Sequence, residues 1–116
     1  MGTEQIIGID RTALRAFMHD SGLDDADIAE LLDVFLAEAP GQIRAVQKAA
    51  AARDAQCLAS AAHALKSPAA LLCAPRLAEI LSGIEEQARD GGIASGHIID
   101  AVEAEVRHVA RQTVDD

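Results

Sequence analysis

The sequence predicts an all-α protein, and two observations lead to this fold class. Only two of the 116 residues are aromatic, Phe17 and Phe35, whereas alanine alone contributes 25. Sheets usually rely on aromatic and β-branched residues. Apolar residues also recur at steps of three and four, and no segment alternates with a period of two. We therefore expect an antiparallel up-and-down four-helix bundle with a short N-terminal capping helix.

Five helices follow from this periodicity, from capping residues and from helix breakers. We expect them to begin near Asp10, Asp24 or Asp25, Asp54, Pro75 and Ser95, and the first four to end near Gly22, Ala52, Leu72 and Gly91. Pro40 falls inside the second segment, but the apolar phase continues past it. That segment should therefore be one kinked helix rather than two independent ones.

The charge of the chain excludes several classes of partner. Ten Lys and Arg residues face nineteen Asp and Glu residues, for a net charge of −9. Binding to nucleic acid or to an anionic membrane surface would need a basic surface. No apolar run reaches the roughly 20 residues of a spanning helix, and residues 1–10 lack the features of a signal peptide. We therefore expect one cytoplasmic domain. Cys57 and Cys73 lack a metal-binding spacing and predict two reduced thiols in or near the core.

The third helix places a histidine opposite its apolar side. At about 100° a residue, the core stripe comprises Leu58, Ala61, Ala62, Leu65, Ala69 and Leu72. His63 lies on the other side, among small or polar residues. A neutral imidazole is a competent nucleophile near pH 7. Lys66, at i+3, would help keep the ring neutral and offset the charge of an incoming phosphoryl group. Ser67, at i+4, leaves room for a partner.

Other candidate sites have less support. His19, His97 and His108 have no accompanying constellation, and an exposed histidine is by itself more often inert than reactive. Neighbouring Glu85 and Glu86 diverge by about 100° on a helix and cannot face one substrate. The sequence contains no metal-ligand spacing and no glycine-rich phosphate loop.

The segment Ala62-His63-Ala64-Leu65-Lys66-Ser67 resembles the histidine phosphotransfer (HPt) domain. The resemblance continues in Leu72-Cys73-Ala74, in Leu77 and Leu81, and in Ile84-Glu85, and it includes the acidic and aromatic segment that ends at Pro40. It implies a single HPt domain over residues 1–116 that is a phosphocarrier and not an autonomous enzyme. His63 would accept a phosphoryl group from a receiver-domain aspartyl phosphate and pass it to another receiver.

The resemblance also implies partners and a supporting residue. The partners would be response-regulator receiver domains or a hybrid histidine kinase. No cofactor of its own is implied, because Mg²⁺ belongs to the partner receiver. In the family, a Glu or Gln at the position of Glu85 lies beside the phosphorylated helix. Glu85 would accept a hydrogen bond from the imidazole Nδ1–H and leave Nε2 to react; the alternative is a solvated acid.

The sequence departs from the family pattern at three positions. Ser67 stands where glycine is most common but is still small. Pro68 replaces the usual serine and should bend the helix one turn after His63. Cys73 replaces a turn glycine, where a left-handed conformation costs another residue roughly 1 kcal/mol.

Two alternative functions remain open at the level of sequence. One is a helical adaptor that docks a receiver domain or kinase without chemistry; the other is the excised HPt domain of a hybrid sensor kinase. The pairing of His63 with Lys66 argues against the adaptor.

Overall fold

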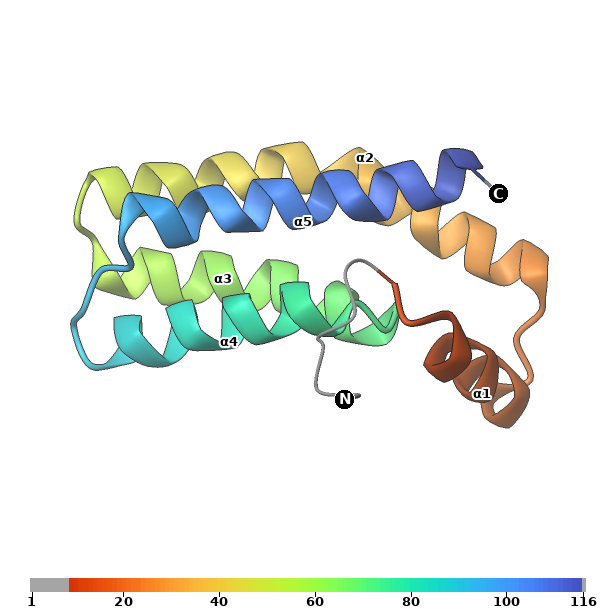
Figure 1. The fold of residues 1–116 in the computed structure, drawn as a ribbon. Helices are drawn as coiled ribbons and strands as arrows, with labels where there is room; N and C mark the ends of the chain where they lie inside the picture. Colours follow the sequence, from red (N-terminus) through yellow and green to blue (C-terminus); the bar gives the residue numbers. More distant parts are fainter. Residues whose placement is uncertain (1–8, 116) are drawn as a thin grey trace, which may run out of the picture.

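The computed structural model describes the backbone of residues 9–115 and the side chains of residues 9–112, and this part of the chain contains five helices and no strand (Figure 1). The helices are α1 (Arg11–Ser21), α2 (Asp25–Ala51), α3 (Ala55–Leu71), α4 (Pro75–Arg89) and α5 (Gly96–Asp115). The predicted all-α class is confirmed, and the expected helix boundaries agree closely with the observed ones. Most of the segment assessed for a signal peptide lies outside the described residues.

Aspartate side chains begin three of the helices as the sequence predicts. Asp10 Oδ1 accepts a hydrogen bond from the backbone N of Ala13 at 3.1 Å. Asp54 caps α3 through the backbone N of Cys57, also at 3.1 Å. At the start of α2, Asp24 and Asp27 each accept from the other's backbone N–H, which is a capping box. These bonds satisfy amide groups that have no partner within the helix.

Two prolines lie inside helices. α2 continues through Pro40, and Figure 1 shows its N-terminal part, in orange, inclined to the rest of the helix. Proline lacks the N–H that would bond one turn back, and its ring crowds that carbonyl, so a bend is the expected response. α3 likewise continues through Pro68 to Leu71.

The four long helices pack in neighbouring pairs. α2 contacts α3 and α5, and α4 contacts the same two helices. In Figure 1, α2 and α5 lie side by side above α3 and α4, while the short α1 lies at the end where α2 begins. The largest fully buried side chains include three leucines spaced by seven, two on α3 and one at its C-cap, and apolar residues of α4: Leu58, Leu65, Leu72, Leu77, Leu81 and Ile84. This apolar contact holds α3 firmly against α4.

The turn between α3 and α4 has an unusual backbone. Cys73 adopts a left-handed conformation with φ +58°, as expected for a residue that replaces a turn glycine. Its carbonyl oxygen accepts a 2.7 Å hydrogen bond from the backbone N of Asp10, so the entry into α1 is fixed to this turn. Arg53, between α2 and α3, is also left-handed at φ +55°. Nothing in the sequence predicts the left-handed conformation of Arg53.

None of the described helices is both long and apolar enough to cross a bilayer.

We predict that the Cys73→Gly variant is more stable than the Cys73→Ala variant. Both Cys73→Gly and Cys73→Ala remove the thiol, but only glycine relieves the left-handed strain at φ +58°. The free energy of unfolding, measured by urea denaturation, should be about 1 kcal/mol higher for the glycine variant. Equal stability of the two variants would contradict a strained turn.

Candidate functional site

His63 lies on the exposed side of α3. Its side chain is 57% exposed, whereas Leu58, Ala62, Leu65 and Ala69 on the opposite side are completely buried. The predicted orientation of this helix is therefore confirmed. The ring is accessible to a second macromolecule while its backbone is held by the core.

Glu85 brings a buried carboxylate to the imidazole from the neighbouring helix. The side chain is only 2% exposed, and Oε2 lies 3.1 Å from His63 Nδ1. The solvated position considered for Glu85 is therefore wrong. With Glu85 ionised, Nδ1 carries the hydrogen and donates it. This contact selects the tautomer whose lone pair lies on Nε2, and Nε2 has no hydrogen-bond partner within the described residues.

Two cations also contact the Glu85 carboxylate. Lys66 Nζ lies 2.7 Å from Oε1, and Arg89, one helical turn after Glu85, forms an ion pair with Oε2. From the sequence, Lys66 is expected to help keep the imidazole neutral and to offset the charge of an incoming phosphoryl group; the structure adds a contact with Glu85. Arg89 was missed. The i, i+4 spacing from Glu85 to Arg89, typical of helical ion pairs, is the signal that identifies it.

These contacts determine the ionisation of Glu85. The pKa of the carboxyl group is lowered from its ordinary value, chiefly by the hydrogen bond from Lys66 and further by His63 and Arg89, although burial opposes this shift. Glu85 is therefore a carboxylate at neutral pH. A buried charge requires such partners because leaving it unpaired is strongly unfavourable.

The surface around His63 forms a shallow depression. It is lined by Ala59, Ser60, His63, Glu85 and Arg89. Ser67, one turn beyond His63, is exposed, and its hydroxyl donates to the backbone carbonyl of His63 at 3.3 Å. Because this bond turns the hydroxyl back onto its own helix, Ser67 adds little height to the surface.

The other histidines do not form a comparable arrangement. His19 and His97 are exposed. His108 Nε2 lies 4.0 Å from the buried Glu105, which also pairs with Arg76 at 3.3 Å. Within the part of the chain that the structure describes, no three side chains are grouped to hold a metal ion.

Both cysteines are free thiols, but only one is near the core. Cys73 is partly buried, whereas Cys57 is exposed on the first turn of α3, contrary to expectation. The pKa of Cys57 is raised by its hydrogen bond to Asp54 and by the charge of that carboxylate. Burial raises the pKa of Cys73, with a smaller effect from Asp10. Both groups are consequently protonated and weak nucleophiles at neutral pH.

Comparisons with known proteins agree with this geometry. The family model of the Hpt domain matches residues 30–112, which is well over half of the chain. A similar solved structure is the histidine-containing phosphotransfer protein B (HptB) from Pseudomonas aeruginosa PAO1. The two chains are 28% identical, with a TM-score of 0.74, and the match covers 87% of this chain and 86% of HptB. The comparison with curated proteins found no match.

We predict that Glu85→Gln destabilises the protein in a pH-dependent manner. At pH 7 the loss should be about 1–2 kcal/mol, because the amide cannot replace charge-assisted bonds. The folded-state pKa of Glu85 is below the ordinary value of 4.5, so its contribution is present above that pH and is lost as the pH falls through the lower folded value. The difference from wild type should therefore close in acid.

Glu86→Gln is the matched control for this measurement. Glu86 is the exposed neighbour of Glu85, and its replacement should change the free energy of unfolding by less than about 0.5 kcal/mol. The free energy of unfolding of both variants is measured by urea denaturation between about pH 3 and about pH 7, a range that includes the ordinary pKa values of carboxyl groups. A Glu85→Gln deficit that is equal at both ends of this interval would contradict the ion-pair account.

Proposed function

Because this chain belongs to the Hpt domain family, we propose that residues 1–116 form a single phosphotransfer domain whose His63 relays a phosphoryl group between receiver domains. Family membership and the likeness to HptB make the chain a phosphotransfer protein of two-component signalling. Such proteins are phosphocarriers and not kinases. The response-regulator receivers and the hybrid kinase are its proposed partners.

The observation that carries this proposal is the contact between Glu85 and His63 Nδ1. It leaves the Nε2 lone pair directed away from the one hydrogen bond that the ring forms with the described residues. In the transfer step, Nε2 attacks the phosphorus of an aspartyl phosphate. A P–N bond forms, the P–O bond to the partner's aspartate breaks, and that carboxylate leaves. Glu85 accepts the hydrogen bond from Nδ1–H throughout and stabilises the positive charge that develops on the ring.

Charge at the site favours the same step. Lys66 and Arg89 supply two positive charges against the single carboxylate of Glu85. The excess positive charge beside His63 is suited to the anionic phosphoryl group. Lys66 and Arg89 therefore have two proposed tasks, to hold Glu85 and to balance the charge of the phosphorylated ring. Mg²⁺ and the acidic pocket that binds it belong to the receiver.

The surface beside the site suits a docked receiver. Val34 is 51% exposed and Leu71 is 43% exposed. Both line a groove between α2 and α3 that also includes Pro68, the residue after Ser67. Exposed apolar side chains near a reactive group are typical of a protein interface. We infer that the receiver covers this groove while its aspartyl phosphate reaches His63.

The finer architecture is part of the same proposal. We infer an antiparallel up-and-down four-helix bundle, formed by α2 to α5 and capped by α1. It is supported by the short connections between successive helices and by the packing of each long helix against two others.

We predict that His63→Gln abolishes phosphoryl acceptance. The purified protein is incubated with a panel of receiver domains carrying radiolabelled aspartyl phosphate, and label on this chain is followed. The variant should stay unlabelled but folded, with only a modest decrease in the thermal unfolding temperature, because it loses the hydrogen bond to Glu85 while Lys66 and Arg89 still pair with that carboxylate. His97→Gln, at another exposed histidine, should accept normally. Labelling that persists in His63→Gln, or that moves to another histidine, refutes the assignment.

We also predict that a bulky residue at position 67 blocks the receiver but not a small phosphodonor. Ser67→Arg should prevent transfer by collision while changing the unfolding free energy by no more than about 0.5 kcal/mol, because the site is exposed. Ser67→Gly is the matched control and should preserve transfer. Phosphoramidate should label His63 in both variants. Normal transfer from the receiver to Ser67→Arg would place the docking surface elsewhere.

A further inference from the structure

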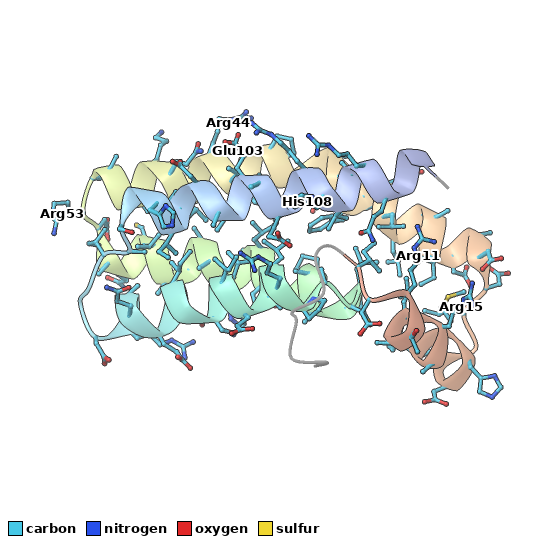
Figure 2. All side chains as sticks on the ribbon, in the orientation of Figure 1. Arg11, Arg15, Arg44, Arg53, Glu103 and His108 are labelled. Carbon is cyan, nitrogen blue, oxygen red and sulfur yellow. The ribbon has the colours of Figure 1, made fainter. Side chains whose placement is uncertain are left out.

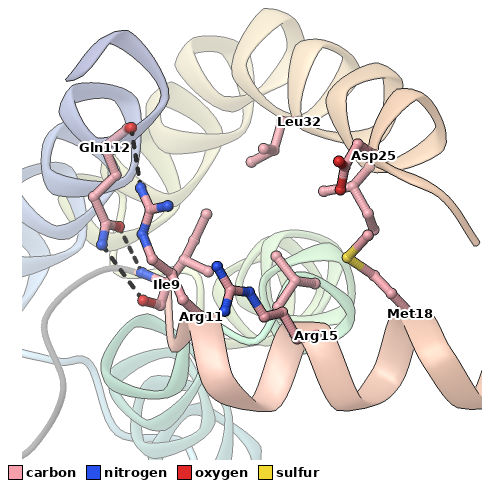
Figure 3. A pocket seen from close by; sticks show the side chains of 9 residues that line it. Ile9, Arg11, Arg15, Met18, Asp25, Leu32 and Gln112 are labelled. Carbon is pink, nitrogen blue, oxygen red and sulfur yellow. Dashed lines mark hydrogen bonds between the residues drawn. The ribbon is translucent and has the colours of Figure 1, made fainter. Parts of the chain in front are cut away.

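A cavity of about 190 Å³ lies between α1, the beginning of α2 and the end of α5 (Figure 3). Apolar side chains make up much of its lining: Ile9, Leu14, Met18, Ile28 and Leu32. Ile9, Leu14 and Ile28 are buried, so this lining belongs to the core and not to an open surface. None of the residues of the His63 site contributes to the cavity.

Two arginines on successive turns of α1 line the same cavity. Arg11 and Arg15 are both exposed, and Figure 3 shows their guanidinium groups on the same side of the opening. Arg11 Nη2 donates to the backbone carbonyl of Gln112 at 3.4 Å. Arg15 has no hydrogen bond or ion pair within the described residues. Asp25 also lines the cavity but is not paired with Arg15. Two like charges at i, i+4 repel each other, which an anion between them would relieve.

One wall of the opening is held by fixed hydrogen bonds. The side-chain amide of Gln112 accepts from the backbone N of Ile9 at 2.7 Å and donates to the Ile9 carbonyl at 3.4 Å. This pair of bonds joins the end of α5 to the residue that enters α1. The opening therefore lies between a hydrogen-bonded wall and the two arginines, which gives it a defined polar rim above an apolar floor.

We propose that this cavity binds a small carboxylate with an apolar body, such as an aromatic or short branched acid. An apolar protein cavity of about 150 Å³ accepts benzene, so about 190 Å³ has room for one ring. The ring would contact Leu14, Ile28 and Leu32, and the carboxylate would accept paired hydrogen bonds from Arg15. The proposal is independent of phosphotransfer because the two sites share no residue.

A titration with benzoate, followed by amide NMR shifts, tests this site in the full chain. Benzoate should cause saturable shifts in α1 and around Ile28, with a millimolar or tighter dissociation constant. Benzyl alcohol has the same ring without the charge, and inorganic phosphate has charge without an apolar body. The alcohol should bind about tenfold more weakly, because it loses the charge-assisted bonds, and phosphate should cause no saturable shift in α1.

Three variants separate the parts of the proposed site. Arg15→Gln should weaken benzoate binding about tenfold without affecting the alcohol. Arg53→Gln is the control, since Arg53 lies at the opposite end of the molecule (Figure 2), and it should bind benzoate normally. Leu32→Phe adds volume inside the cavity and should abolish binding of both ring compounds. All three should still accept phosphate on His63.

Several results would overturn the proposal. Absence of saturable benzoate shifts at millimolar concentration excludes the site. Equal binding of benzoate and benzyl alcohol, or unchanged binding in Arg15→Gln, excludes selection of an anion. Saturable binding of inorganic phosphate to α1 would identify a simple anion site at the arginines without the apolar requirement.

Discussion

The contact between the buried carboxylate of Glu85 and the imidazole of His63 is the constraint on which the rest of the structure depends. It joins α3 to α4 and places an ionised group where only 2% of the side chain is exposed. Such a charge is tolerated only with partners, which Lys66 and Arg89 supply. A shift of either helix by one residue would separate these groups. The leucine contacts between α3 and α4 therefore fix the geometry of the His63 ring as well as the stability of the fold.

The short connection between these two helices maintains the same alignment. α3 ends at Leu71 and α4 begins at Pro75, so the chain reverses direction within three residues. Cys73 accomplishes this in a left-handed conformation that is unfavourable for a residue with a side chain. Its carbonyl is also the acceptor for Asp10, so the turn fixes both the α3–α4 alignment and the position of α1. The strain at one residue is thus compensated by the contacts that the turn makes possible.

Local rules predict the helices and the exposed histidine, but they do not predict the contacts between helices. The caps at Asp10, Asp24 and Asp54 and the face of His63 depend on short-range spacing, and the structure agrees with all of them. The burial of Glu85 depends on what α3 places against α4, so periodicity alone left it undecided. The contact of Lys66 with Glu85 depends on the same packing, whereas Arg89 lies one turn from Glu85 on α4 and could have been identified from the i, i+4 spacing. The left-handed Arg53 has no glycine to mark it, and the exposure of Cys57 follows from helix orientation, which a count of cysteines ignores.

The distribution of charge indicates where partner specificity resides. The chain carries a net charge of −9, and a receiver pocket that binds Mg²⁺ is itself acidic, so long-range attraction does not bring the two together. At physiological ionic strength, charges farther apart than about 8 Å are largely screened, which weakens this repulsion but leaves close contacts intact. In the proposed function, recognition of a receiver therefore depends on the surface within a few side chains of His63. There, Lys66 and Arg89 reverse the sign of the local charge. Val34 and Leu71 supply exposed apolar area in the separate groove between α2 and α3. In the proposed function, the cations that would face a phosphoryl group are the same ones that hold Glu85, so a substitution that changes recognition at this surface would also alter the environment of the His63 imidazole.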